Sequence, residues 1–524
     1  MTNDYDVIVI GGGLGGLTAA ALIAQAGRRT LLIERNREIG GAASSYQVGN
    51  LFVEASLHET SDPHDPIDPK HHALARLGVL DEVEWVPTGS MYEVRGGPIR
   101  EPFLMPDDFS KAKSALVERF PSVAAGIRSV FGDMERIATG LGILSKGRRA
   151  FHNPMEGLSA VVRLGPMVKG WRFSLADRFN QAFDSNEAVK CALAANLPYF
   201  HDDPDELWWI LFAVAQGGFL ASGGRYIKGG SQRLSRALAK ALTSAGGEIL
   251  LGRAVTEITI NQEGRASGVA HSRSEGGEQL EATAPVIVGN AAPAVVVKML
   301  PRSARERFWR RYAGRRLSIS LFSATFGLSA RPAEFGFKSY STFLLPKWMK
   351  QLADYRRCGE LMATMPAEAM PPIAIVDYSA IDSGLGGPPY SVAVVGVDRA
   401  SNWSGLDGAG YDARRNGWRD AILQAIDVVF PGFAAKVVAS TFTTASTIST
   451  YLNAPGGAVY GFAPSPPSGP IWRGLQQSPN TPIRGLYLAS SYAGSGGFTG
   501  AILAGAAAAD QVLLERRATA KRAS

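Results

Sequence analysis

Short runs of apolar residues separated by glycine-rich breaks open the chain. Residues 7–10, Val-Ile-Val-Ile, are continuously apolar and β-branched, which is typical of a parallel strand buried on both faces. Small and apolar residues then fill 14–26 and predict a helix, which Gly27 ends. A second apolar run at 29–33 predicts a second strand. This order predicts a β-α-β unit of an α/β protein with a parallel sheet.

The turn between the first strand and the helix carries a glycine pattern. Gly11, Gly13 and Gly16 fit the spacing G-x-G-x-x-G. In this pattern the first glycine permits a tight turn, the second lets the backbone approach a pyrophosphate, and the third lets the helix pack close to the strand. The helix N-terminus adds partial positive charge at the phosphates. Glu34 ends the second strand at the spacing where a carboxylate accepts ribose hydroxyls and disfavours a 2′-phosphate, so the unit is predicted to bind FAD or NAD rather than NADP.

The same periodicities predict the elements of the rest of the chain. Apolar residues at three- and four-residue spacing predict helices, and shorter β-branched runs predict strands, of which 268–270 and 284–288 are hairpin-like. The predicted helices cover 73–80, 111–131, 233–245, 417–429 and 500–514, and the predicted strands cover 248–251, 255–260, 268–270, 284–288, 317–325, 391–397 and 485–489. We find no internal repeat.

Length and composition limit the function classes. A chain of 524 residues with 46% hydrophobic content buries a large core and is expected to form two interleaved domains. Its net charge of +7 is modest for this length, which makes nucleic acid a poor partner but suits an anionic phospholipid surface. Cys191 and Cys358 form no C-x-x-C, so they predict neither a disulfide framework nor a cysteine zinc site. No basic segment precedes the first apolar run, so we expect a cytoplasmic protein.

Glycine-rich motifs spread over nearly the whole chain carry a family resemblance. They are residues 11–16, Glu34-Arg35 with Gly40-Gly41, the central 228–231 followed by 246–247 and 255–258, and the closing 485–491 with 496–501. Together they resemble the phytoene desaturase, carotenoid isomerase and retinol saturase group of FAD-dependent oxidoreductases. The closing motif discriminates best, because a plain NAD dehydrogenase has no use for a second glycine-rich strand-to-helix turn.

The resemblance implies an α/β fold with a Rossmann-type FAD-binding domain and an inserted α+β substrate domain. The FAD domain would comprise 1–72, 222–295 and 480–515, the substrate domain 73–221 and 296–479, and a basic tail 516–524. Flavin contact by the closing turn would explain why 485–509 carries no charge without a transmembrane helix. The residues implied in FAD binding are Gly11, Gly13, Leu14, Gly15, Gly16, Glu34, Arg35, Gly40, Gly41, Ala42, Val255, Ser490, Ser491, Gly497, Phe498 and Thr499.

Two departures from the family pattern bear on the site. Relatives usually carry Gly-Asp where this chain has Ser490-Ser491, so a hydroxyl replaces a carboxylate that faces the ribityl chain. After the glycine doublet, relatives often show a glycine-arginine pair or a Phe-Asp-x-Gly element, whereas this chain has Ala-Ala-Ser-Ser at 42–45 and Phe-Val-Glu-Ala at 52–55. These departures leave flavin binding intact and leave the reaction open.

By the same resemblance, the substrate is a hydrophobic isoprenoid or polyene whose C–C or C=C bonds undergo redox chemistry. The first expectation is desaturation by hydride transfer to flavin N5. Saturation or cis–trans isomerisation of a polyene is the alternative, because the same scaffold serves all three. Amine oxidation and a non-catalytic, flavin-binding membrane partner are further alternatives. The oligomeric state is left open.

Flavin chemistry needs no protein nucleophile, but one proton must be managed. The candidates are Glu54 and His58, whose loop follows the glycine doublet. The alternative is that Glu54 pairs with an arginine and His58 is an ordinary loop histidine. The stretch 61–72 adds further histidines and aspartates, but their spacing matches no compact ligand pattern and its prolines favour an extended surface loop, so no metal site is predicted.

Two segments that mix basic and apolar residues predict peripheral contact with the inner face of a membrane. Residues 302–316 contain seven arginines with three aromatic residues, and 148–172 has a similar mixture. The alternative for both is a solvated basic helix face. The aromatic-rich 208–220 is predicted either to line an apolar tunnel or to pack in a core.

Overall fold

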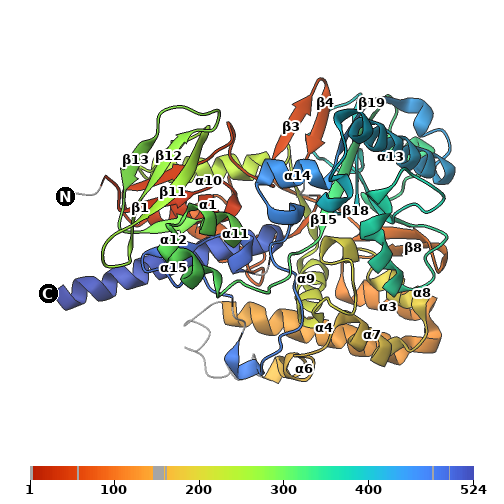
Figure 1. The fold of residues 1–524 in the computed structure, drawn as a ribbon. Helices are drawn as coiled ribbons and strands as arrows, with labels where there is room; N and C mark the ends of the chain where they lie inside the picture. Colours follow the sequence, from red (N-terminus) through yellow and green to blue (C-terminus); the bar gives the residue numbers. More distant parts are fainter. Residues whose placement is uncertain are drawn as a thin grey trace.

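The computed structural model describes residues 4–55, 58–145, 159, 162–474, 477–494 and 496–523. Figure 1 shows two lobes side by side. One lobe contains the red start of the chain, the green strands of its middle and the blue helix of its end, and the other contains mostly the orange, yellow and teal parts. Segments far apart in the sequence therefore build the first lobe together.

A five-stranded parallel sheet forms the centre of the first lobe. Its order is β10 (Glu248–Leu250), β2 (Thr30–Ile33), β1 (Val7–Ile10), β14 (Ile287–Gly289) and β20 (Leu486–Leu488). β1 is buried on both faces and pairs in parallel with β2 and β14, as its β-branched sequence predicts. The strand order changes direction between β1 and β14, which is where doubly wound sheets bind ligands. The predicted α/β fold class is confirmed, whereas the predicted domain bounds stay a prediction.

Three helices pack on one face of this sheet. They are α1 (Leu14–Gln25), α10 (Gln232–Ser244) and α15 (Gly497–Ala523). α15 packs closely on α1, because a Cβ at Gly505 would overlap the carbonyl oxygen of Gly15. Within the described residues, α15 is long and apolar enough over Gly497–Glu515 to cross a membrane, but 44% of its apolar window is buried inside the protein. Close packing on α1 is therefore one reason why the sequence of α15 up to residue 509 carries no charge.

The opposite face of the parallel sheet carries a small antiparallel sheet and two helices. The strands are β11 (Arg253–Ile260), β12 (Ala266–Arg273) and β13 (Leu280–Thr283), and the helices are α11 (Pro293–Met299) and α12 (Arg302–Trp309). Of the two hairpin-like pieces, 268–270 lies in this sheet. The piece 284–288 does not, because its last two residues enter the parallel sheet as part of β14.

A seven-stranded mixed sheet forms the centre of the second lobe. Its order is β19 (Val437–Thr443), β15 (Ser320–Leu328), β18 (Tyr390–Asp398), β17 (Ile373–Asp377), β16 (Ser341–Leu345), β7 (Tyr92–Gly96) and β8 (Ile99–Met105). One face packs on a helical layer of α3 (Phe109–Arg119), α4 (Ala124–Ser145), α6 (Gly165–Lys169), α7 (Leu175–Phe183), α8 (Glu187–Leu193) and α9 (Trp209–Ser222). The other face packs on α13 (Gly408–Val429).

Short elements connect the lobes. They are the hairpin β3 (Ser45–Val48) and β4 (Leu51–Glu54), the sheet β5 (Thr60–Ser61), β9 (Gly224–Ile227) and β6 (Trp85–Pro87), and the helices α2 (His71–Leu77) and α14 (Ala445–Leu452). The hairpin contacts β15 and β18 of the second lobe, so it joins the chain's start to the distant sheet.

The helix predicted at 111–131 is two helices. α3 ends at Arg119 and α4 begins at Ala124, with a 3-10 turn between them. Pro121 cannot donate a helical hydrogen bond and disfavours the helical conformation of Phe120, which has φ −127° and ψ 62°. Apolar spacing continues across this break, so periodicity alone missed it.

The stretch 61–72 is more buried than its prolines indicate. Lys70 is fully buried, and its Nζ donates to Asp68 at 2.8 Å and to Ser61 at 2.9 Å. Burial lowers the pKa of Lys70, while the carboxylate of Asp68 opposes this shift. The prediction of an extended surface loop is therefore wrong, because a buried ion pair anchors the stretch.

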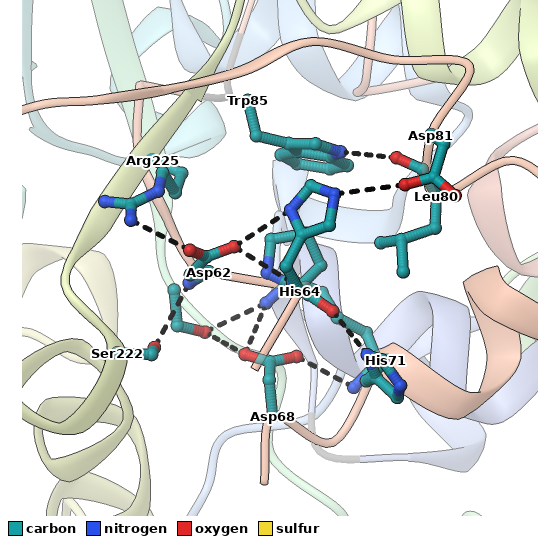
Figure 2. A network of polar contacts seen from close by, with 12 residues as sticks. Asp62, His64, Asp68, His71, Leu80, Asp81, Trp85, Ser222 and Arg225 are labelled. Atoms are coloured by element: carbon teal, nitrogen blue, oxygen red, sulfur yellow. Dashed lines mark hydrogen bonds and ion pairs between the residues drawn. The ribbon is translucent and has the colours of Figure 1, made fainter. Parts of the chain in front are cut away.

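The histidines of this stretch are held in the same polar network, which Figure 2 shows from close by. The His64 ring lies between Asp62 and Asp81, with nitrogens 3.3 and 3.4 Å from their carboxylates. Arg225 of β9 pairs with Asp62 at 2.8 Å, and His71 bonds to a backbone carbonyl. Among the described residues, no group of three or more histidine, cysteine, aspartate or glutamate side chains is arranged to hold a metal ion. The absence of a metal site stays a prediction.

Candidate functional site

A cavity of about 1460 Å³ opens at the carboxyl ends of β1 and β14 and reaches into the second lobe. Single ligand pockets typically occupy about 300–1000 Å³, so this cavity has room for a dinucleotide and a second molecule. Glycine turns and charged side chains line its dinucleotide end, at residues 10–15, 33–43 and 496–500. The apolar chamber is lined by Met91, Tyr92, Phe200, Leu211, Val214, Phe219, Phe343 and Tyr460.

The first glycine turn leaves open the approach to the N-terminus of α1. Gly11 has φ +99°, which favours glycine, and a Cβ at Gly16 would overlap the Gly11 carbonyl oxygen. A Cβ at Gly13 would lie 3.0 Å from Asn290 Nδ2 and 4.0 Å from the Gly40 carbonyl oxygen, so the protein backbone leaves space there. Gly13 is the N-cap of α1 and has no side chain to cover the first N–H groups. Such uncapped N–H groups bind phosphate.

Glu34 stands at the end of β2 and is only 6% exposed. Its two oxygens accept hydrogen bonds from the N–H groups of Gly12, at 2.6 Å, and Asn36, at 2.8 Å. Each carboxylate oxygen keeps a further lone pair for a ribose hydroxyl. Arg35 also lines the cavity, but its guanidinium donates to the carbonyls of residues 450 and 451, each at 2.5 Å. Arg35 therefore ties the dinucleotide end to α14.

The glycine doublet and the closing turn complete this end. Gly40 has φ +115° and its N–H donates to the Gly12 carbonyl at 2.8 Å, which brings the doublet beside the first turn. In the closing turn, the Ser490 hydroxyl donates to the Ala291 carbonyl at 3.0 Å and keeps its lone pairs free to accept. Every predicted cofactor residue except Gly16 lines the cavity. Their individual roles stay predictions.

Sequence reasoning missed several polar residues at this end, among them Asn290, Arg233 and Arg236. Asn290 follows β14, and its Nδ2 donates to the Gly11 carbonyl at 3.3 Å. Arg233 and Arg236 lie one helical turn apart on α10 and both line the cavity. Asn290 had a readable signal, because it follows a predicted parallel strand and such strand ends share one edge of the sheet. The arginines had none, since their helix reads as an ordinary amphipathic one.

The aromatic run at 208–220 serves both predicted purposes. Leu211, Val214 and Phe219 line the apolar chamber, and four other large apolar residues lie in the core of the second lobe. These core residues are Trp208, Trp209, Phe212 and Leu220. α9 carries apolar residues on all sides, so one face packs on α4 while another faces the chamber.

A protein-family model described as flavin containing amine oxidoreductase matches residues 14–316. The chain belongs to the flavin containing amine oxidoreductase family. The protein is therefore a flavin-dependent oxidoreductase. The uncapped helix, the glycine turns and Glu34 fit the phosphates and ribose of such a cofactor.

The curated relatives of this chain include retinol reductases and phytoene desaturases. All-trans-retinol 13,14-reductase of Rattus norvegicus is 24% identical over 484 residues, covering 87% of this chain and 77% of the relative. Phytoene desaturase (neurosporene-forming) of Rhodobacter capsulatus is 26% identical over 472 residues, covering 87% and 84%. The predicted resemblance to desaturases and saturases is confirmed.

Solved structures show the same fold. Cyclohexylamine oxidase from Brevibacterium oxydans has a TM-score of 0.57 and 17% identity, covering 98% of this chain and 100% of that chain. An oxidoreductase from Methanosarcina mazei has a TM-score of 0.59 and 16% identity, covering 96% and 99%. At such identities the likeness concerns the fold alone.

The two proton candidates of this flavin oxidoreductase occupy different places. Glu54 is fully buried and is absent from the cavity lining, although its neighbours Val53 and Ala55 belong to it. Its carboxylate accepts from the N–H of Ser231, at 2.8 Å, and from the Ser231 hydroxyl, at 2.5 Å. Because Ser231 is the N-cap of α10, this contact anchors a helix. The geometry gives Glu54 a structural role, and its catalytic role stays a prediction.

His58 lines the cavity and is 5% exposed. Its Nδ1 lies 2.9 Å from the Tyr378 hydroxyl, which orients the ring. Burial lowers the pKa of His58 to about 4, so the imidazole is neutral at pH 7. The residue is well placed to shape the chamber, and its part in proton exchange stays a prediction.

Proposed function

We propose that this protein binds FAD without a covalent link and transfers hydride between flavin N5 and the C–C or C=C bonds of a hydrophobic polyene. The single observation that carries the proposal is one cavity that joins a dinucleotide end to an apolar chamber. Glu34 and the uncapped α1 would hold the adenosine and pyrophosphate of FAD, and the closing turn 497–499 would meet the flavin side. The bound flavin supplies the two-electron acceptor or donor.

The proposed direction is desaturation, with saturation as the second candidate. Relatives named for each reaction support the two directions, since phytoene desaturase and all-trans-retinol 13,14-reductase match similar shares of the chain. In either direction the protein's task is to exclude water and to hold an extended apolar molecule beside the flavin. The aromatic and aliphatic lining of the apolar chamber does both.

The proposal is tested by mixing the protein with polyenes under anaerobic conditions. We expect an acyclic polyene to bleach the oxidised flavin if the protein desaturates, and to restore the absorbance of chemically reduced flavin if it saturates. Product analysis of lipid extracts, from a host with and without the chain, identifies the bond that changes. Bleaching by amines but by no polyene would reject the proposal in favour of amine oxidation. A flavin that neither class reduces or oxidises would favour the non-catalytic alternative.

We also propose that this protein is cytoplasmic and docks on the inner face of a membrane through α12 and the residues that follow it. Six of the seven arginines at 302–316 are exposed, including Arg307, Arg310 and Arg311, and Arg315 is half-buried. The aromatic residues contribute less than the sequence indicates, because Phe308 and Tyr312 are buried and only Trp309 is exposed, at 38%. The attraction is therefore mainly electrostatic.

Replacing Arg307, Arg310 and Arg311 with serine is expected to weaken binding to anionic liposomes by on the order of 100-fold, at about 1 kcal/mol for each arginine. High salt should have a similar effect on the wild type, because exposed charges are screened over about 8–10 Å. Co-sedimentation at low and high salt measures both. Serine at Arg100, Arg128 and Arg136, which are exposed in the second lobe, is the charge-matched control. Equal binding by both triple variants would contradict this docking surface.

The second basic-apolar segment lies partly outside the described residues, which include only 159 and 162–172 of it. Trp171 Nε1 donates to the Gly469 carbonyl at 2.9 Å, which brings α6 beside residues 468–473. Val162, Val168 and Trp472 are 69%, 58% and 84% exposed in this region. These side chains form a second candidate contact, which the same liposome assay tests with Trp472→Ser.

A further inference from the structure

Glu59, an acid that sequence reasoning did not single out, lines the cavity away from its dinucleotide end. Glu59 precedes β5 and lines the cavity next to His58. Its Oε1 accepts a hydrogen bond from the Thr88 hydroxyl at 2.8 Å. A Cβ at Gly224 of β9 would overlap the same oxygen, so glycine at that position leaves the space that the carboxyl group fills. The carboxyl group is therefore held in one place.

Among the described residues, the other acids that line the cavity are Glu34 and Glu38 at the dinucleotide end. Among these acids, Glu59 is thus the one whose carboxyl group is available to a substrate away from the dinucleotide end. No ion pair joins Glu59 to a cation of the described chain, and the nearby Arg225 is instead paired with Asp62 at 2.8 Å. A carboxyl group without a cation, held by one neutral hydrogen bond, is free to gain and lose a proton.

The surroundings of Glu59 on balance disfavour its charged form. Burial and the negative charge of Asp107 raise the pKa of Glu59 to about 8, against a smaller opposing effect of the Thr88 hydrogen bond. The neighbouring His58 is neutral at pH 7. Tyr199 and Tyr340 stay protonated, because burial raises their pKa values well above the usual range. An acid with its pKa near the working pH suits proton exchange.

We propose that Glu59 is the catalytic residue that exchanges the substrate proton. This assignment rests on the proposed function. In desaturation, one C–H bond breaks and its hydride, with both electrons, goes to the flavin. A C–H bond on the adjacent carbon also breaks, its proton goes to the Glu59 carboxylate, and its electron pair becomes the new π bond. The substrate loses two electrons and the flavin gains them; saturation is the reverse, with protonated Glu59 as the donor.

The direction of the reaction determines how its rate depends on pH. Desaturation needs ionised Glu59, so its rate is expected to rise as pH increases through about 8, where this group titrates. Saturation needs the protonated acid, so its rate is expected to fall over the same range. In Glu59→Gln this change of rate with pH should disappear in either direction of the reaction, because glutamine does not titrate.

The test compares Glu59→Gln and Glu59→Asp with the wild-type holoenzyme. We expect Glu59→Gln to keep its FAD content and to bind the polyene within a few-fold, measured by fluorescence quenching, while hydride exchange with the flavin slows by about 10²–10⁴-fold. Glu59→Asp should recover part of the rate. Infrared titration should show a carboxyl band that disappears near pH 8 in the wild type and is missing in Glu59→Gln. Glu82→Gln, at an exposed acid, is the matched control and should behave as the wild type.

Three results would overturn the assignment. The first is Glu59→Gln with the wild-type rate and pH profile, and the second is a wild type without a carboxyl group that titrates near pH 8. The third is loss of FAD or polyene binding in Glu59→Gln, which would make the residue structural. If the wild type binds FAD but exchanges hydride with no polyene, the proposed function itself fails, and that result is distinct from a slow variant of an active enzyme.

Discussion

Gly13→Val is expected to give a folded protein that has lost its flavin. Within the protein, the valine Cβ would press on the Asn290 amide, at 3.0 Å, and would have ordinary contact with the Gly40 carbonyl oxygen, at 4.0 Å, but the side chain would fill the approach to the first N–H groups of α1. Hydrogen bonds to a charged group contribute roughly 1.5–3 kcal/mol each, so losing two of them weakens binding by on the order of 10²–10⁴-fold. Acid precipitation of the wild type should release yellow FAD into the supernatant, and the variant should release none.

Two further variants separate cofactor binding from folding. Glu34→Ala removes one charged acceptor and should only weaken binding, by roughly 10–150-fold at 1.5–3 kcal/mol. Gly15→Val should disturb the fold itself, because a Cβ there would overlap the backbone oxygen of Ala489. Circular dichroism and flavin occupancy together distinguish the three outcomes. Full occupancy in Gly13→Val would mean that this turn does not meet the phosphates.

Lys70→Met is expected to cause a large loss of stability. The variant leaves the Asp68 carboxylate buried without its cation, and breaking one side of a buried ion pair costs about 3–5 kcal/mol. Lys240→Met, at an exposed pair with Glu82, is the matched control and should cost at most about 1 kcal/mol. Urea unfolding measures both effects.

The double variant Lys70→Met with Asp68→Leu tests the cause. Removing both charges takes away the unpaired carboxylate, so part of the lost stability should return, although the Ser61 hydroxyl loses its acceptor. If Lys70→Met is as stable as Lys240→Met, then the network of Figure 2 does not anchor the stretch.

Local sequence patterns predicted the structure best where the conformation of a segment depends mainly on its own residues. The β-branched run of β1, the glycine turn and the apolar helix after it each state their conformation within a few residues, and their bounds agree with the structure to within about two residues. The closing turn was found in the same way. Periodicity failed at Pro121, where apolar spacing continued through a break in the backbone.

The choice of acid could not be made from the sequence. Glu54 and Glu59 lie on one short segment with no regular periodicity, and each is oriented by partners far along the chain. Ser231 donates hydrogen bonds to Glu54. Thr88 donates one to Glu59, whose carboxyl group fills the space beside Gly224. The same holds for Lys70, whose burial depends on how the stretch packs against the rest of the protein.

The sequence by itself determined the nucleotide-binding turn, the parallel sheet around it and the flavoprotein family, because glycine conformations and strand patterns act over a few neighbouring residues. Only the tertiary structure decided which side chains face the cavity, how far the apolar chamber extends and which charges are buried in pairs. These properties depend on how segments far apart in the sequence pack together, as Glu54 does with Ser231, 177 residues away. Such contacts leave no periodic signal in the chain.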